Sequence, residues 1–286
     1  MLVNLKEITA LAEEKRIAVG AFNAVSLASM KAVIRAAEEM QQPVVLQFAQ
    51  VHSVFNRIDD LAPLMLKYAT NACVPVCVHL DHGEDLDFVK KALDLGFTGV
   101  MFDGSKLPLE QNYELSTKAV EMANEYGAGV EAELGSMGRT EDGTGIGTGS
   151  EDETKIYTDP SLAKDFVAQT GIDALACSFG TTHGIYLKEP KLDFTVVDNV
   201  RRECGGIPVV MHGGSGVSEE DYGKAIDSGV RKINYFTYMD KAGAEAVRNY
   251  LTGHEKDPLF TAMTFSAEEA MKENVKNAIR IFSRIK

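Results

Sequence analysis

The sequence Val76-Cys-Val-His-Leu-Asp-His-Gly83 decides the fold, because it joins a buried strand to a group of reactive side chains. Pro75 precedes it, and the apolar residues at its start are typical of a strand inside a sheet. The strand ends in His79, Asp81 and His82, which an apolar interior would not tolerate without partners. A strand that becomes polar at its carboxyl end, just before a glycine, is typical of an α/β enzyme site. Taken alone, the same side chains would also suit ordinary hydrogen-bonded strand ends.

The composition is typical of a globular protein, and the negative net charge indicates which binding partners are unfavourable. The chain has 286 residues, 45% of them hydrophobic and 25% charged, which is enough for one large core or two modest domains. Its formal net charge of −13 argues against nucleic acid and anionic membranes as partners. The four cysteines form no Cys-x-x-Cys pair, and we find neither an apolar signal region nor an apolar run of membrane length. We therefore expect a cytoplasmic protein with reduced thiols.

Apolar runs and helical periods alternate along the whole chain. The predicted strands cover residues 18–22, 44–48, 76–83, 99–102, 129–134, 173–178, 208–211 and 230–234. The predicted helices cover residues 5–16, 26–40, 61–72, 85–95, 109–126, 159–169, 194–203, 219–228, 239–251 and 267–285. Residues 135–158 lack an apolar period and are expected to form a loop.

Eight predicted strands, each followed by a helix, favour one closed (β/α)8 barrel, the TIM barrel of the α/β class. Two doubly wound domains of four units each would give the same count. However, no composition break separates the two halves, and polar clusters follow the strands from one end of the chain to the other. We therefore predict a single barrel domain over residues 1–286.

The carboxyl ends of all strands in such a barrel open on one face, so that residues distant in sequence become neighbours there. The polar side chains at these ends are Asn23, Gln47, Asp81, His82, Asp103, Glu133, His183, His212 and Asn234. Three of the six histidines of the chain are among them, in three different units and close to glycine. Three imidazoles on one face would form the open site of a catalytic zinc ion, with a position left for water or substrate. One such histidine alone would more often be an ordinary hydrogen-bonded residue.

A short glycine-rich loop, His212-Gly-Gly-Ser-Gly216, follows the seventh predicted strand. Its main-chain amides can approach an anion closely, because most of its residues carry no side chain. The loops after the seventh and eighth strands of barrels often hold phosphate, and Asn234 to Thr237 adds further donors there. A Gly-Gly-Ser-Gly sequence is more often just a tight turn, but its position here predicts a phosphate site.

Six short motifs follow one another between Phe22 and about Thr237. They are Val78-His-Leu-Asp-His-Gly83, Phe102-Asp-Gly-Ser105, Val130-Glu-Ala-Glu-Leu-Gly135, Gly180-Thr-Thr-His-Gly184, His212-Gly-Gly-Ser-Gly216 and Lys232-Ile-Asn234. As an ordered set, they resemble the class II, zinc-dependent ketose-bisphosphate aldolases, which include fructose- and tagatose-bisphosphate enzymes. The resemblance covers most of the chain.

The resemblance implies a catalytic Zn²⁺ ion and names the residues around it. The zinc ligands would be the three histidines His82, His183 and His212. Asp81 would be the catalytic acid or base, and Glu141 a second carboxylate for proton transfer. Asp103 and Glu133 would either form a second metal position or support the histidines. A monovalent cation, Na⁺ or K⁺, is a further cofactor that we expect on this basis.

The resemblance also implies the residues that bind the substrate. The phosphate end of dihydroxyacetone phosphate and the rest of the substrate would contact Asn23, Gln47, Gly184, Lys188, Gly213, Gly214, Ser215, Asn234, Tyr235, Phe236 and Thr237. The partner is thus a small sugar phosphate, and relatives imply a homodimer or a homotetramer.

The reaction implied is reversible aldol cleavage of a phosphorylated ketose to dihydroxyacetone phosphate and an aldehyde. A zinc ion would stabilise the negative charge that develops next to the carbonyl. Asp81 would take the proton from the hydroxyl whose carbon becomes the aldehyde. The loop of residues 135–158 would either close over the site with Glu141 or remain a solvated surface loop.

Two positions depart from the pattern common among fructose-bisphosphate aldolases. Phe236 stands where an acidic residue is common, and Ala49 stands where a serine often occurs. The loss of a carboxylate and a hydroxyl indicates a less polar aldehyde portion. The substrate is therefore left open between a ketose 1-phosphate and a 1,6-bisphosphate such as fructose or tagatose bisphosphate.

Other functions remain open from the sequence. One is a different metal-dependent sugar-phosphate enzyme, either an epimerase or a hydrolase, although hydrolases usually carry His-x-His on the first strand, where this chain has Phe22-Asn23. Another is a non-catalytic sugar-phosphate binder, which would have no need of zinc ligands and Asp81. A Schiff-base aldolase would need a lysine inside the barrel, and Lys232 is the candidate.

Overall fold

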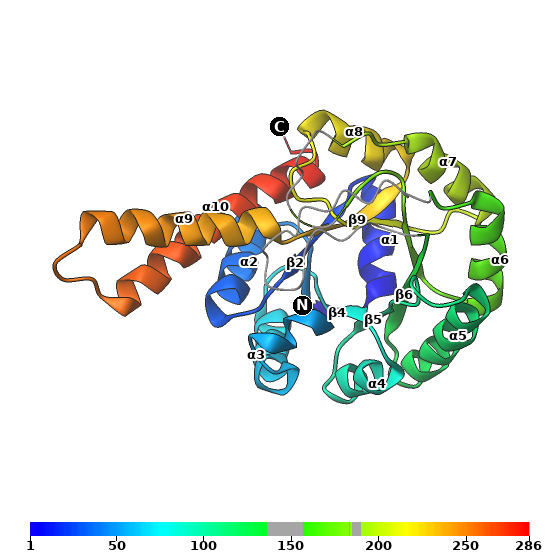
Figure 1. Cartoon of the computed structure of the whole chain (residues 1–286), viewed down its shortest axis with the longest axis horizontal. Helices are drawn as coiled ribbons and strands as arrows, with labels where there is room; N and C mark the ends of the chain where they lie inside the picture. Colours follow the sequence, from blue (N-terminus) through cyan, green and yellow to red (C-terminus); the bar gives the residue numbers. More distant parts are fainter. Residues whose placement is uncertain (136–156, 183, 185–189, 286) are drawn as a thin grey trace.

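The computed structural model describes residues 1–135, 157–182, 184 and 190–285, which form a closed barrel of eight parallel strands (Figure 1). The barrel strands are β2 (Val19–Asn23), β3 (Val44–Ala49), β4 (Val76–Gly83), β5 (Gly99–Phe102), β6 (Gly129–Leu134), β7 (Ala174–Cys177), β8 (Val209–Met211) and β9 (Val230–Tyr235). Neighbouring strands pair in chain order, and β9 pairs with β2 to close the ring. The predicted (β/α)8 barrel is confirmed.

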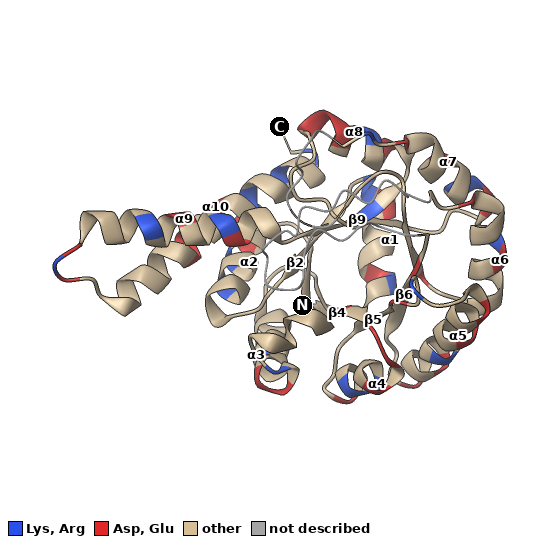
Figure 2. Ribbon diagram, viewed as in Figure 1, with Lys and Arg blue, Asp and Glu red and all other residues tan. Residues whose placement is uncertain are grey.

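Helices follow the strands; most of them surround the barrel in Figure 1, and the last two project from it. They are α2 (Leu27–Met40), α3 (Ile58–Asn71), α4 (Leu86–Asp94), α5 (Leu109–Glu125), α6 (Pro160–Thr170), α7 (Phe194–Glu203), α8 (Glu219–Ser228), α9 (Thr237–Gly253) and α10 (Phe260–Phe282). Figure 2 shows that charged residues are spread along these outer helices, where water solvates them. No helix of the described ranges is long and apolar enough to cross a bilayer.

Three helices begin earlier than the sequence predicts, and the difference is smallest for α9, which begins at Thr237 rather than at residue 239. Helix α3 begins at Ile58 rather than Leu61, and Asp59 in its first turn suits the positive end of the helix dipole. Helix α10 begins at Phe260 rather than at residue 267. Its first turns carry exposed apolar side chains, such as Phe265, so they lack the amphipathic period on which the prediction relied.

Helix α1 (Leu5–Lys15) closes the amino-terminal end of the barrel. It follows the short strand β1 (Leu2–Val3), which pairs with β4 and was not predicted. Asn4 caps the helix by accepting a hydrogen bond from the Glu7 N–H, and Glu7 accepts one from the Asn4 N–H in return. Leu5 and Ile8 then pack into the lower barrel interior. The described residues at this end therefore form an apolar, packed cluster.

The inner faces of the strands change from apolar to polar toward their carboxyl ends. Side chains of a strand alternate between its two faces, so Cys77, His79 and Asp81 of β4 point to the same side. Cys77 packs with the apolar cluster around α1, whereas His79 and Asp81 lie in the polar half. The buried polar residues that continue this pattern on other strands are Asn23, Gln47, Glu131, Glu133, Lys232 and Asn234. The fold thereby directs a set of polar groups to the carboxyl-terminal end.

Phe282 attaches the end of α10 to the barrel. Its ring is fully buried and packs edge-on against Tyr222 and Tyr235. Its carbonyl accepts a hydrogen bond from the N–H of Ala18, just before β2. The helix therefore supports the strand pair β2–β9.

We predict that Phe282→Ala lowers the free energy of unfolding by about 3–5 kcal/mol, because it leaves a cavity in a packed interior. Phe282→Leu should cost less, since more of the volume is retained. Asn277→Ala, on an exposed part of the same helix, is the control and should have a much smaller effect. Urea unfolding followed by circular dichroism measures all three variants. Equal losses for Phe282→Ala and Asn277→Ala would contradict the packing argument.

Candidate active site

A cavity opens at the carboxyl ends of the strands and, with its mouth, encloses about 700 Å³. Its walls come from β2, β3, β4 and β9 and from the segments that follow β3, β7, β8 and β9. The lining residues are Asn23, Ala49, Val51, His52, Asp81, His82, Gly184, Gly213, Gly214, Ser215, Asn234, Tyr235, Phe236 and Thr237. Most of the side chains expected at the site are therefore gathered in one place.

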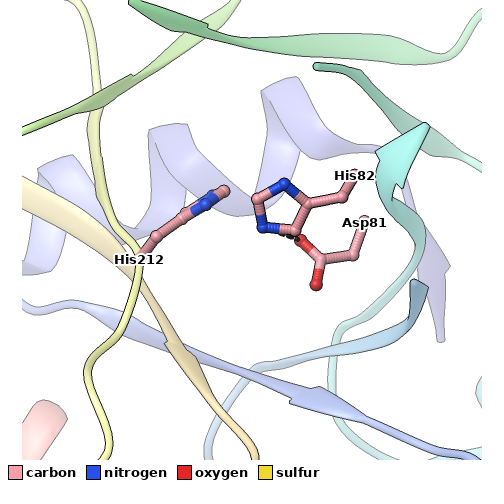
Figure 3. Close-up of side chains that lie close together, drawn as sticks. All are labelled: Asp81, His82 and His212. Atoms are coloured by element: carbon pink, nitrogen blue, oxygen red, sulfur yellow. Dashed lines mark ion pairs between the residues drawn. The ribbon is translucent and has the colours of Figure 1, made fainter. Parts of the chain in front are cut away.

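Asp81 and His82 are adjacent in sequence, yet both reach this cavity. In a regular strand they would point to opposite faces of the sheet. His82 instead has a φ of 43°, and the pairing of β4 with β5 is irregular between Leu80 and Gly83. The His82 Nε2 atom lies 3.9 Å from Asp81 Oδ1, and Figure 3 shows the two side chains side by side. A left-handed backbone at a non-glycine residue is unfavourable, and such strain is typical of functional positions.

Three side-chain amides from three other strands hold the carboxylate of Asp81. Asn23 Nδ2 and Gln47 Nε2 donate to its Oδ2 atom at 3.0 and 3.2 Å. Asn234 Nδ2 donates to its Oδ1 atom at 2.9 Å. Burial alone would raise the pKa of Asp81, but the nearby histidines, led by His82, together with these hydrogen bonds hold that pKa well below its usual range. Asp81 is therefore an oriented, ionised carboxylate that can accept a proton.

Gln47 differs in its position from the other predicted substrate residues that the structure describes. It is fully buried and is not among the cavity-lining residues. Besides Asp81, its amide donates a hydrogen bond to Asn23 Oδ1 at 3.0 Å. It thus lies behind the reactive carboxylate and steadies the amides around it.

His82 and His212 lie next to each other, with ring centroids 4.6 Å apart and planes at 73° (Figure 3). Each ring has a carboxylate on one nitrogen: Asp103 Oδ2 lies 2.8 Å from His82 Nδ1, and Glu131 Oε1 lies 2.7 Å from His212 Nε2. A carboxylate on one nitrogen fixes the tautomer of a neutral imidazole and directs the lone pair of the other nitrogen. Burial opposes protonation of His82, but Asp81 and Asp103 outweigh it and raise its pKa to about 9.

Two overlapping groups of side chains have the donors and the spacing of a metal site. One consists of Asp81, His82 and His212, and the other of His82, Asp103 and Glu133. Within each group, one ligand atom from every residue lies within 4.8 Å of the others. Imidazole nitrogens and carboxylate oxygens are ligands that suit Zn²⁺. A cation would also balance the negative charge that these buried carboxylates bring together. The residues present therefore fit a zinc ion.

Three predicted site residues, His183, Glu141 and Lys188, lie outside the described residues. Their roles as third zinc ligand, proton-transfer group and substrate contact remain predictions. Gly184, directly after His183, is described, is buried and lines the cavity.

Lys232 lies inside the barrel as the partner of a buried carboxylate. Its Nζ atom is 2.9 Å from Glu131 Oε2 and donates to Asn234 Oδ1 at 2.7 Å. A lysine ammonium can only donate, so this contact turns the NH₂ group of Asn234 toward Asp81. Burial alone would raise the pKa of Glu131, but Lys232, with further help from His212, lowers it to about 2. The lysine nitrogen is thus committed to two partners, which argues against a Schiff-base role.

The loop after β8 packs closely on its neighbours. A Cβ atom on Gly213 would collide with the carbonyl of Thr182, and one on Gly214 with the carbonyl of Asn234. The Gly214 N–H donates to that same Asn234 carbonyl at 3.2 Å. The glycines are therefore needed for close backbone approach, and the Gly214 amide, expected to be available to an anion, is already used within the chain.

Helix α9 begins at the wall of the cavity. Thr237 is its first residue, and the preceding Phe236 provides no side-chain cap for the first N–H groups. Both residues line the cavity. The positive end of the helix dipole makes this wall suitable for an anionic group.

His52 lines the cavity and was not predicted. It belongs to the 3-10 helix η1 (Gln50–Val54) that follows β3, a segment for which no helix was predicted. Burial, its largest influence, lowers the pKa of this histidine to about 4, so the ring is neutral at physiological pH. Its position just after a barrel strand could have indicated a site residue. The sequence analysis, however, selected only histidines that lie close to glycine.

Known proteins resemble the chain over nearly its full length. A family model described as fructose-bisphosphate aldolase class-II matches residues 3–285. A fructose-bisphosphate aldolase from Staphylococcus epidermidis is 39% identical over 286 residues, covering 98% of this chain and 97% of the relative. A probable fructose-bisphosphate aldolase from Bacillus subtilis is 38% identical over 288 residues, with the same coverage of 98% and 97%. The crystal structure of the YdjI aldolase from Escherichia coli K12 is similar with a TM-score of 0.85 and 32% identity, covering 99% of this chain and 97% of that one.

The buried pair of Lys232 and Glu131 leads to a stability prediction. Lys232→Met should lower the free energy of unfolding by about 3–5 kcal/mol, because it leaves the Glu131 charge without its main partner in the interior. Lys232→Met combined with Glu131→Gln should be less destabilised than the single variant, since no unpaired charge remains. The control is Lys224→Met on the exposed side of α8, which should unfold like the parent protein. Chemical denaturation at neutral pH measures the free energy of unfolding of each variant. A double variant that is less stable than Lys232→Met would contradict the ion-pair argument.

Proposed function

The chain belongs to the class-II fructose-bisphosphate aldolase family, and on this premise we propose how its cavity cleaves a phosphorylated ketose. As a member it is an aldolase, a carbon–carbon lyase of a family that depends on zinc. We propose that the products are dihydroxyacetone phosphate and an aldehyde. The observation that carries this proposal is an ionised Asp81, fixed by three amides, beside two histidines that each have a carboxylate partner.

The zinc ion would be held by His82 and His212, with His183 as the third ligand. When bound, it supplies a Lewis acid that stabilises negative charge next to the substrate carbonyl. Asp103 and Glu131 hold the two described histidines in orientation. A second metal position at His82, Asp103 and Glu133, or a monovalent cation at the phosphate, would be an addition to this arrangement.

Asp81 performs the proton transfer that starts cleavage. It accepts the proton of the hydroxyl whose carbon becomes the aldehyde, and the C–O single bond there becomes the C=O double bond of the aldehyde as the adjacent C–C bond breaks. The electron pair of the broken bond remains with the half that becomes dihydroxyacetone phosphate. Asn23 and Asn234 keep the carboxylate in place and would hold it as it gains the proton. Glu141 is our candidate for returning a proton to the carbon of that half.

The phosphate end of the ketose would lie at the start of α9. The amino-terminal end of this helix faces the cavity through Thr237, and the helix dipole favours an anion there. Ser215 and Thr237 line the cavity beside this turn, as does Gly184. Lys188, which follows Gly184 in the sequence, would add a positive charge.

The whole chain, residues 1–286, would act as one domain in a homo-oligomer in the cytoplasm. Helices α9 and α10 project from the barrel as an antiparallel pair (Figure 1). Exposed apolar side chains, Leu259, Phe260 and Phe265, lie at the start of α10 and would be covered in a homodimer or homotetramer. The cysteines, none of them in a disulfide, suit a reducing compartment.

We predict that chelation abolishes cleavage and that added Zn²⁺ restores it. The reason is that a bound divalent ion would be the Lewis acid that stabilises the negative charge on the half that becomes dihydroxyacetone phosphate. Release of dihydroxyacetone phosphate, measured in a coupled assay, follows the loss and the recovery. Activity that survives chelation, together with borohydride trapping on Lys232, would reject the zinc mechanism.

A second prediction concerns the base. Asp81→Ala should lower kcat by about 10²–10⁴-fold, the usual contribution of a positioned general base. Zinc content and binding of dihydroxyacetone phosphate should be retained, because the histidines and the start of α9 are unchanged. The control is Asp87→Asn, an exposed carboxylate in the first turn of α4, which should keep the parent rate. Normal turnover by the Asp81 variant would remove this residue from the mechanism.

A further inference from the structure

We propose that His52 and Phe236 form the subsite for the aldehyde-derived portion of the ketose. This subsite takes an uncharged chain that carries a hydroxyl group, rather than a second phosphate. The substrate class is then a ketose 1-phosphate. The inference rests on the aldol cleavage proposed above and identifies His52 as a residue that determines specificity.

The two rings meet on the cavity wall formed by the segments that follow β3 and β9. His52 follows β3 and Phe236 follows β9, and the strand between them in the barrel is β2, which carries Asn23. The ring centroids of His52 and Phe236 are 4.8 Å apart, with planes tilted by 48°. Ala49 and Val51 line the cavity next to them. This wall is therefore mostly apolar, with one polar ring in it.

The imidazole of His52 is buried yet forms no hydrogen bond to the other described residues. His52 is only 6% exposed, and its buried Nδ1 atom has no hydrogen-bond partner in the described part of the chain. A buried polar nitrogen without a partner is unfavourable, because it has lost its hydration without gaining a hydrogen bond. A ligand hydroxyl would supply the missing partner, since a neutral imidazole offers one donor and one acceptor.

The charges around the subsite do not suit a second phosphate. None of the described lining residues is a lysine or an arginine. The ionisable lining groups that act on His52 are the carboxylate of Asp81 and the imidazole of His82, which are assigned above to the base and to the metal site. A phosphate against Phe236 and a neutral imidazole would lose its hydration without gaining a cationic partner. An uncharged polyol end avoids this cost and still satisfies the imidazole.

The first experiment compares two substrates that share the dihydroxyacetone phosphate half. Fructose 1-phosphate ends in an uncharged glyceraldehyde portion, whereas fructose 1,6-bisphosphate ends in a phosphate. We expect the parent enzyme to have the higher kcat/KM with fructose 1-phosphate. A higher kcat/KM with the bisphosphate would overturn the proposal of an uncharged subsite.

The second experiment changes His52. His52→Leu keeps much of the side-chain volume but removes both nitrogens, and should lower kcat/KM for fructose 1-phosphate by about 10–100-fold. His52→Asn, which retains a donor and an acceptor, should recover part of this loss. Two analogues of fructose 1-phosphate, one without the C5 hydroxyl and one without the C6 hydroxyl, identify the group that His52 binds. The loss in kcat/KM caused by His52→Leu should be smaller for the analogue that lacks this hydroxyl. Equal losses on all three substrates would overturn the hydrogen-bond assignment.

Proton exchange between dihydroxyacetone phosphate and solvent separates this inference from the proposed function, because exchange needs only the shared half. His52→Leu should reduce cleavage at least about 10-fold more than it reduces exchange. Equal reduction of both would show that His52 acts on the shared half and would overturn the subsite. Parent enzyme that neither exchanges nor cleaves would overturn the aldol mechanism itself. His254→Leu, on the exposed end of α9, is the matched control and should leave both rates unchanged.

Discussion

The structure depends on neutralising carboxylates that are buried at one end of a parallel barrel. Asp81, Asp103, Glu131 and Glu133 gather there, and burial of an unpaired carboxylate would be costly. The chain meets this constraint in two ways. It surrounds Asp81 with amide donors, and it gives Glu131 a buried ammonium group and an imidazole. The remaining negative charge is what a divalent cation would balance, so the interior electrostatics and the metal site are one arrangement.

The apolar and polar halves of the barrel interior support each other. Helix α1 fills the lower half with Leu5 and Ile8, which leaves the carboxyl-terminal half as the place where polar groups can meet. Lys232 connects several of these polar groups. It forms an ion pair with Glu131 and donates a hydrogen bond to Asn234, which in turn donates one to Asp81. A lysine that is not among the cavity-lining residues thereby connects the stability of the interior with the position of the base.

The sequence alone predicts the parts of this arrangement that rest on local patterns. The alternation of strands and helices, and the polar residues at the strand ends, follow from periodicity and from the geometry of parallel barrels. The contacts between side chains do not, because they depend on the register of strands far apart in sequence. The link from Lys232 to Asn234 and the use of the Gly214 amide by a neighbouring carbonyl are of this kind. The criterion of histidines close to glycine missed His52, and its contact with Phe236, between segments on either side of β2, cannot be read from local sequence.

The irregular backbone of β4 has a consequence for protein engineering. Asp81 and His82 share one cavity because β4 is irregular at this point. The φ angle of His82 is in the left-handed region, and the pairing of β4 with β5 shifts between Leu80 and Gly83. An Asp-His dipeptide transplanted onto a straight strand of another scaffold would separate its two functional groups onto opposite sides of the sheet. The motif can therefore be moved to a new protein only together with its backbone conformation. A design that copies the Asp-His sequence alone will not place the base and the metal ligand in the same cavity.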